Sequence, residues 1–205
     1  MTPRDLFKKL RMQHRSLVSP LCRLHSLCQS DYHCNRPTKT PVINFDKIKE
    51  QYCKKRNIIY MPPSVDAISI SQSGNTFCFI ELKSWVKYLV HTKHDISAGS
   101  INRQVKRYHF REKLQSSMKI CTEMSDRDFF KVNNFAYLIV TDAEAQLRID
   151  AAKSFALAMF SLAETSSRKW RPECIAATDR AISKFRGINV RHISCQDFDK
   201  VIASL

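Results

Sequence analysis

The stretch from Ser64 to Ser84 constrains the fold more than any other part of the chain, because it predicts a β-hairpin with nearly apolar strands. The first apolar run ends at Ile70, and the second spans 77–82. Residues 72–75 between them read Gln-Ser-Gly-Asn, and Gly and Asn tolerate the positive φ angles of tight turns. An isolated hairpin is barely stable in water, so we expect the rest of the chain to pack around this one.

Three charged residues interrupt the apolar hairpin. Glu81 and Lys83 stand two residues apart on the second strand, so their side chains point to the same face. Asp66 can reach the same place from the neighbouring strand. Burying charges is unfavourable unless they are paired or hold a metal ion, so this convergence predicts a functional site. The alternative is a salt-bridged cluster without chemistry, which would stabilise the fold poorly.

The spacing resembles the signature of the PD-(D/E)xK nuclease superfamily, an Asp followed after a turn by Glu-x-Lys. Here the signature reads Asp66 and then Glu-Leu-Lys at 81–83. Gln104 and Tyr108 follow at the spacing and in the order of the QxxxY element in the RecB-like branch of that superfamily. The resemblance covers roughly residues 45–141. It implies a restriction-endonuclease-like core and a metal-dependent nuclease that hydrolyses phosphodiester bonds in DNA.

The resemblance also implies roles for individual residues. Asp66 and Glu81 would bind Mg²⁺ or Mn²⁺, with the carbonyl of Leu82 as a third oxygen ligand. Lys83 would orient or deprotonate the attacking water, or stabilise developing negative charge. Glu50, on a helix expected before the hairpin, is a candidate for a further acidic ligand, the alternative being a surface Glu beside lysines.

Residues 100–122 predict one long helix with an apolar stripe after the hairpin. Gln104 and Tyr108 share a face of this helix, and the resemblance implies that they position the metal site or the substrate strand. Three arginines at the same spacing predict a second, basic face that binds phosphates: Arg103, Arg107 and Arg111. The alternative is a half-buried Tyr108 and a solvated basic stripe.

The charge of the chain favours a polyanionic partner. Its net charge is +15, with 34 Lys and Arg against 19 Asp and Glu. Such an excess suits nucleic acid, bound through phosphate contacts, with DNA favoured over RNA by the resemblance. Two alternatives stay open: a non-catalytic nucleic-acid-binding subunit on a nuclease scaffold, and an RNA-directed nuclease effector. A homo-oligomer or a larger protein complex is compatible with each of these three functions. No apolar run predicts a membrane span.

The chain contains 8 cysteines without the regular spacing of a disulfide framework, which favours a reducing intracellular compartment. The cytoplasm or nucleus is expected, with an organelle as a minor option because the first 30 residues are basic. A structural Zn²⁺ is a minor possibility at Cys22, His25, Cys28 and Cys34. Unligated thiols and imidazoles are the default, because the spacing fits no common zinc module.

The order of predicted elements indicates an α/β fold, a mixed β-sheet flanked by helices. Residues 1–43 are expected to form a basic N-terminal helix and loop extension, and 44–205 the nuclease-like domain. Further elements are predicted as a loop over 19–42, helices over 45–56, 145–163 and 173–185, and strands over 134–141 and 187–194.

Overall fold

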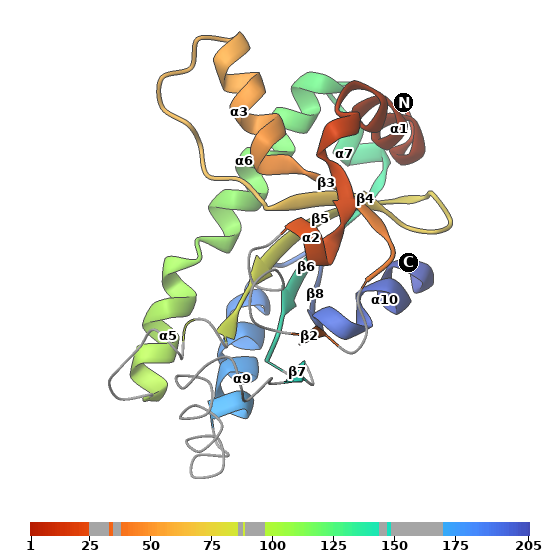
Figure 1. Ribbon diagram of the computed structural model, residues 1–205. Helices are drawn as coiled ribbons and strands as arrows, with labels where there is room; N and C mark the ends of the chain where they lie inside the picture. The colour runs from red at the N-terminus through yellow and green to blue at the C-terminus, as the bar shows by residue number, and fades with distance from the viewer. Residues whose placement is uncertain (25–32, 35–37, 86–87, 89–96, 144–146, 149–169) are drawn as a thin grey trace.

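A six-stranded mixed β-sheet forms the centre of the molecule in the computed structural model (Figure 1). The structure describes residues 1–24, 33–34, 38–85, 88, 97–143, 147–148 and 170–205. Among these residues, no helix combines the length and the apolar character that crossing a bilayer requires.

The strand order of the sheet is β1-β3-β4-β5-β6-β8. The first four strands run antiparallel to one another, whereas β5, β6 and β8 are parallel. A separate two-stranded sheet pairs β2 with β7. The strands span β1 Val18–Pro20, β2 His33–Cys34, β3 Pro41–Asn44, β4 Ala67–Ile70, β5 Thr76–Lys83, β6 Asn134–Thr141, β7 Leu147–Arg148 and β8 Asn189–Ser194.

Helices lie on both faces of the six-stranded sheet and account for most of the remaining described residues (Figure 1). Their bounds are α1 Pro3–Gln13, α2 Leu21–Leu24, α3 Phe45–Lys55, α5 Ala98–Arg107, α6 Phe110–Met124, α7 Phe129–Val132, α9 Trp170–Ile182 and α10 Phe198–Ser204, with short 3₁₀ turns at Arg15–Leu17 and Cys195–Asp197.

The sheet separates two hydrophobic cores, and β5 contributes to both because successive side chains of a strand point to opposite faces. Phe77 and Phe79 pack in the larger core together with residues of α1, α3, α5, α6, α7 and α9. Cys78 and Ile80 pack in the smaller core with α2 and α10. The apolar run on β5 therefore results from a strand that is covered on both faces.

The structure confirms the α/β class and the hairpin. Strands β4 and β5 pair antiparallel, and Gly74 in their turn has a φ of +77°. The buried strand predicted over 134–141 is β6, parallel to β5, and β8 lies within the strand predicted over 187–194.

The single long helix predicted over 100–122 is wrong, because α5 ends at Arg107 and α6 begins at Phe110. His109 between them adopts a left-handed conformation with φ +50°. In a continuous helix, Tyr108 and Phe110 would point to opposite sides. The break lets both rings pack in the larger core, 5.5 Å apart between centroids, and it removes Arg111 from the helical face of Arg103.

Three other predicted elements differ from the structure. The predicted loop over 19–42 contains strand residues of β1 and β3 that join the main sheet. The division into an extension over 1–43 and a domain over 44–205 stays a prediction. The part of the predicted helix over 145–163 that the structure describes, Leu147–Arg148, is strand β7. The rest of that segment lies outside the described residues. The helix predicted over 173–185 begins earlier, at Trp170, and ends at Ile182.

Candidate active site

Asp66 lies directly before β4 and is held between two helices. Its backbone oxygen accepts a hydrogen bond of 3.0 Å from the amide of Phe45, the first residue of α3. The amide of the preceding Val65 donates to the buried hydroxyl of Ser117 on α6, also at 3.0 Å. The Asp66 carboxylate accepts a hydrogen bond of 2.6 Å from the amide of Leu82, so it faces the end of β5.

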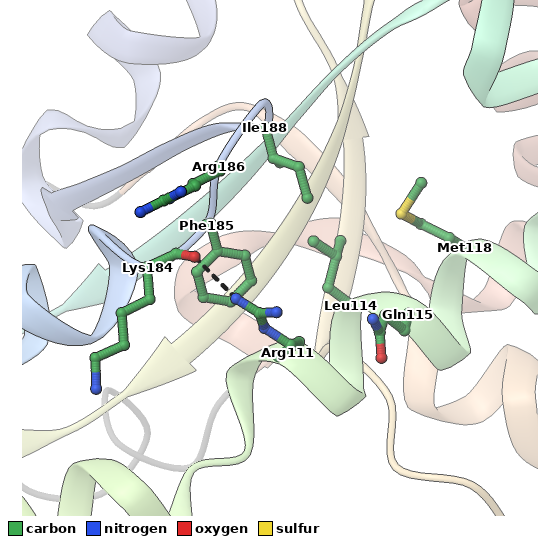
Figure 2. Close-up of a pocket in the computed structure, with 8 residues that line it drawn as sticks. All are labelled: Arg111, Leu114, Gln115, Met118, Lys184, Phe185, Arg186 and Ile188. Atoms are coloured by element: carbon green, nitrogen blue, oxygen red, sulfur yellow. Dashed lines mark hydrogen bonds between the residues drawn. The ribbon is translucent and has the colours of Figure 1, made fainter.

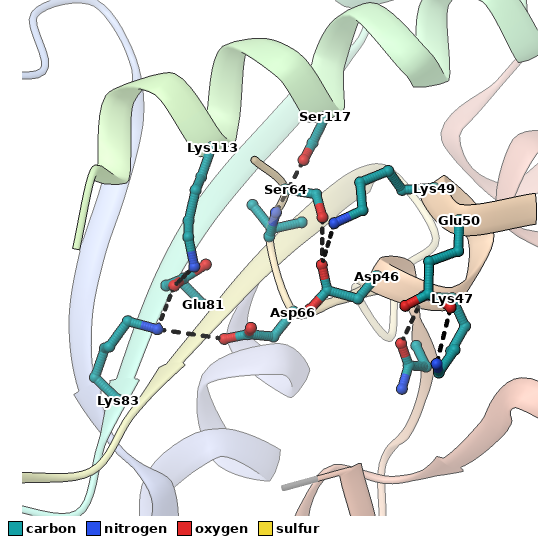
Figure 3. A network of polar contacts seen from close by, with 12 residues as sticks. Asp46, Lys47, Lys49, Glu50, Ser64, Asp66, Glu81, Lys83, Lys113 and Ser117 are labelled. Atoms are coloured by element: carbon teal, nitrogen blue, oxygen red, sulfur yellow. Dashed lines mark hydrogen bonds and ion pairs between the residues drawn. The ribbon is translucent and has the colours of Figure 1, made fainter. Parts of the chain in front are cut away.

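Three oxygen atoms converge on the ammonium group of Lys83 at this end of β5, and Figure 3 shows the two that belong to the carboxylates of Asp66 and Glu81. Nζ of Lys83 lies 2.8 Å from the carbonyl oxygen of Leu82 and 3.7 Å from Oδ2 of Asp66, and it forms an ion pair with Oε1 of Glu81. These are three of the groups to which the family resemblance assigns metal binding, Glu50 being the further candidate. A cationic group thus contacts all three of them at once.

A second ammonium group, that of Lys113, reaches Glu81 from α6. Its Nζ lies 2.5 Å from Oε1 of Glu81 (Figure 3). Lys113 precedes Ser117 by one helical turn, so the same face of α6 contacts both Glu81 and the segment before Asp66. Sequence reasoning missed Lys113, because nothing in the sequence distinguishes it from the other lysines once 100–122 is treated as one helix.

Glu81 has an unusual electrostatic environment. Its side chain is 0 % exposed, and burial, followed by the nearby negative charge of Asp66, raises its pKa to about 7. Lys83 and Lys113 oppose this shift without cancelling it. Burial lowers the pKa of Lys113, but Glu81 and Asp66 outweigh that effect, so its pKa is raised. Oε2 of Glu81 is buried without a hydrogen-bond partner among the described residues.

The two residues of the QxxxY motif, Gln104 and Tyr108, contact each other, and Tyr108 lies beside Lys83. Burial raises the pKa of Tyr108, and a hydrogen bond with Gln104 partly opposes this. The centroid of the Tyr108 ring lies 5.2 Å from Nζ of Lys83, a cation–π distance. Arg103 and Arg107 are exposed on α5. Arg111 is the predicted substrate-binding residue that lies elsewhere, against the segment after α9, where it donates to a backbone carbonyl.

The helix before the hairpin offers a different acid from the expected Glu50. Glu50 forms an ion pair of 2.8 Å with Lys47, and its side chain is 43 % exposed. Asp46 of α3 lies nearer to Asp66 in Figure 3 and accepts a hydrogen bond from Ser64. Asp46 also contributes to the raised pKa of Lys113, which places it within electrostatic reach of the site. Asp46 is therefore the acid of α3 that the structure brings to this site.

The oxygen donors fit a hard divalent cation. Among the described residues, no group of three or more His, Cys, Asp or Glu side chains could hold a metal ion. The candidate donors are accordingly two carboxylates, of Asp66 and Glu81, and the carbonyl of Leu82. Mg²⁺ prefers oxygen ligands and keeps several of its waters, so two carboxylates are enough to bind it. The unpartnered Oε2 of Glu81 provides a buried lone pair for such an ion.

A hydroxyl–imidazole–carboxylate chain at the ends of β6 and β8 was not predicted. Oγ1 of Thr141 lies 2.9 Å from Nε2 of His192, and Nδ1 of His192 lies 2.9 Å from Oδ1 of Asp179. The order of groups is that of a nucleophile triad. Thr141 is only 3 % exposed, and it lines a small cavity of about 120 Å³ together with His192 and Asp179. These two hydrogen bonds tie α9, which carries Asp179, to the sheet.

The possible zinc ligands are described only in part. The Cys22 thiol sulfur accepts hydrogen bonds of 3.2 Å from the amide and the hydroxyl of Thr38. His25 and Cys28 lie outside the described residues, and of Cys34 only the backbone, in β2, is described. The zinc site stays a prediction.

Fold and site define the chain as an α/β protein with a mixed sheet and a partly buried Asp-Glu-Lys cluster at one end of its central hairpin. No known family model matches the chain. Neither a curated protein nor a solved structure shows significant similarity to it.

Proposed function

We propose that the protein is a metal-dependent nuclease that hydrolyses phosphodiester bonds, with DNA as its substrate. The observation that carries this proposal is the convergence of Asp66, Glu81 and the Leu82 carbonyl on one cation, the ammonium group of Lys83. Closely spaced and largely buried charged groups contribute little to the stability of a fold. Their presence here therefore favours a chemical role for these residues.

The two carboxylates and the carbonyl would hold Mg²⁺ or Mn²⁺, which supplies charge neutralisation at the phosphate and an activated water. Lys83, released from these oxygens, orients the attacking water or donates a hydrogen bond to the phosphate oxygens. The positive charge of Lys113 favours the ionised form of Glu81, and the ring of Tyr108 holds the ammonium group of Lys83 next to the site.

The topology supports this assignment with one departure. The resemblance implies a core of helix, three strands, helix and strand. Between α3 and α5, the described residues form two strands, β4 and β5. Strand β3, which precedes α3 in the chain, pairs with β4 and occupies the position of the third antiparallel strand. A parallel strand, β6, follows the next helices, as the core requires.

A non-catalytic nucleic-acid-binding subunit is the second candidate. The pairing of Glu81 with two ammonium groups and its complete burial favour this alternative, because a ligand that is already neutralised binds a metal less readily. The net charge of +15 supports nucleic-acid binding in either case.

A cleavage assay separates these candidates. Purified protein is incubated with single-stranded DNA, duplex DNA and RNA, each with Mg²⁺, Mn²⁺ or EDTA. Lys83→Ala and Asp66→Asn are compared with Lys119→Ala, which removes an exposed lysine from α6. We expect metal-dependent cleavage of DNA that both site variants lose and the control keeps. Cleavage of RNA alone would instead indicate the RNA-directed nuclease, and salt-sensitive binding without cleavage would indicate the binding subunit.

A further inference from the structure

A cavity of about 380 Å³ lies between α6 and the segment that joins α9 to β8 (Figure 2). The apolar part of its wall is formed by Leu114, Met118, Phe185 and Ile188. This volume is within the range of sites that hold small organic ligands.

The polar part of the wall is strongly basic. Of the described residues that line the cavity, Arg111, Lys184 and Arg186 are cationic and none is acidic. Three positive charges beside an apolar floor favour a ligand with an anionic group and a flat apolar group. A nucleotide unit has this combination, because it joins a phosphate to a base.

Arg111 is fixed in the geometry that such a ligand needs. Its Nη2 donates a hydrogen bond of 2.8 Å to the backbone oxygen of Lys184, and its Cζ lies over the ring of Phe185, 5.4 Å from the centroid (Figure 2). Bases stack both on aromatic rings and on guanidinium planes. The Arg111–Phe185 pair is therefore a stacking platform.

Helix α6 contributes residues both to the cavity and to the contacts of the Asp-Glu-Lys cluster. Helix α6 carries Lys113 towards Glu81 and Arg111 towards the cavity. The Phe185 ring also packs against Tyr137 of β6, with 5.9 Å between the centroids. Burial raises the pKa of Tyr137, and the negative charge of Glu81 adds to this, so Tyr137 is within electrostatic reach of the cluster. Helix α6 and Tyr137 thus connect the cavity with the candidate active site.

We propose that this cavity binds one nucleotide of a single-stranded nucleic acid, with the base against the Arg111–Phe185 platform and the phosphate at Lys184 and Arg186. Bases in a duplex are paired and stacked, so only an unpaired nucleotide enters. The assignment of this nucleotide to the strand that is cut rests on the proposed function. The binding itself does not depend on cleavage.

The test measures binding in EDTA, where the proposed cleavage does not occur. A fluorescent oligothymidylate is titrated with the wild-type protein and with Phe185→Leu, which keeps an apolar side chain but removes the aromatic face. We expect the affinity to fall about tenfold, as when a base loses its aromatic partner. Thermal unfolding of both proteins establishes that the variant is folded, and duplex of the same length is expected to bind equally well to both.

Variants that remove a positive charge test whether Lys184 and Arg186 bind the phosphate of the nucleotide. Lys184→Gln and Arg186→Gln are compared with Lys200→Gln, which removes an exposed lysine of α10, a helix of the other core. We expect each cavity variant to reduce the slope of log affinity against log salt concentration by about one, which corresponds to the loss of one phosphate contact. The control should reduce this slope less. Thymidine 5′-monophosphate should compete with the oligonucleotide much better than inorganic phosphate.

Several results would overturn the inference. Equal affinity of Phe185→Leu and wild type for single strands would exclude the stacking platform, and equal competition by inorganic phosphate would reduce the cavity to an anion site. These failures are distinct from failure of the proposed function. Oligothymidylate binding is measured in EDTA and cleavage is measured separately with Mg²⁺, so loss of cleavage and loss of cavity binding are separated.

Discussion

Lys113 and Glu81, which are 32 residues apart in the chain, form an ion pair of 2.5 Å in which the carboxylate is fully buried. This pair joins α6 to the end of β5, where Asp66 and Lys83 also lie. The two ammonium groups on Glu81 lower its pKa, yet burial keeps that pKa near 7. Glu81 is therefore the group through which pH and nearby charge act on the site.

Lys113→Met is expected to raise the pKa of Glu81 further, because one of the two positive charges that lower it is lost. The change should also destabilise the fold by about 1–3 kcal/mol, the usual effect of removing one partner from a buried charged hydrogen bond. In the nuclease assay, cleavage at pH 7 falls and recovers at higher pH, where Glu81 ionises again.

Lys119→Met is the matched control, because Lys119 is exposed on the same helix. It should leave both the free energy of unfolding and the pH–rate profile close to those of the wild type. If Lys113→Met behaved like this control in both measurements, Lys113 would have no electrostatic role at the site.

Glu81 should make the stability of the metal-free protein depend on pH. Its pKa in the folded state, about 7, lies above the ordinary value of 4.5, so between these values the folded state keeps a proton that the unfolded chain releases. The stabilisation from the protonated form is complete below about pH 4.5 and is lost as the pH rises to about 7. The loss amounts to about 3 kcal/mol.

Urea unfolding of the wild type and Glu81→Gln at pH 5 and pH 8, in EDTA, measures this effect. The variant has no such proton to release, so its stability relative to the wild type should increase with pH. Asp197→Asn, at an exposed carboxylate, should show no such trend. A constant difference between Glu81→Gln and the wild type would show that the pKa of Glu81 is ordinary.

Two glycines with left-handed backbone conformations differ in what a side chain would meet. Gly74 has φ +77°, and a Cβ there would lie 2.3 Å from Nε of Arg4, whose guanidinium group donates to the Ser73 carbonyl. Gly187 has φ +72°, and nothing described lies within 4 Å of its Cβ position. Gly187→Ala should therefore cost about 1–2 kcal/mol, the backbone term alone.

Gly74→Ala carries the same backbone term and also displaces Arg4, so it should be the more destabilising of the two. Arg4→Ala in the Gly74→Ala background removes the steric part and should bring the cost of the glycine change close to that of Gly187→Ala. Equal effects of the two single changes would mean that Arg4 moves aside freely.

Local patterns in the sequence were sufficient to predict the hairpin, the buried strand β6 and the convergence of Asp66, Glu81 and Lys83. Alternation of side chains and turn residues depends on neighbours in the chain, so it can be read without the tertiary structure. The break at His109 could not be predicted, because neither Gly nor Pro stands there. It arises from two aromatic rings that both pack in one core.

The acidic residues of the preceding helix show the same limit. Glu50 and Asp46 lie four residues apart on α3, so both were available to the sequence pattern. Which of them faces Asp66 depends on where α3 begins, and the cap residue Asn44 together with the hydrogen bond from Phe45 to Asp66 fixes that start. Lys113 was missed for a related reason, since its direction depends on the start of α6 after the break.

Asp46→Asn and Glu50→Gln are the last matched pair, and they test which acid supports metal binding. A ligand that binds only the folded state raises the melting temperature, and for a chain of this size saturating Mg²⁺ at about 100 times its Kd should raise it by about 5 °C or more. Both acids are half-exposed and each is paired with a lysine, but Asp46 lies nearer to Asp66 than Glu50 does in Figure 3. We therefore expect Asp46→Asn to reduce the Mg²⁺-induced shift and Glu50→Gln to leave it unchanged, as measured by differential scanning fluorimetry with and without EDTA. Asp66→Asn should abolish the shift.

The opposite ranking of the pair would return the role of the supporting acid to Glu50. The absence of any Mg²⁺ effect on the melting temperature of the wild type would count against a metal site at this cluster.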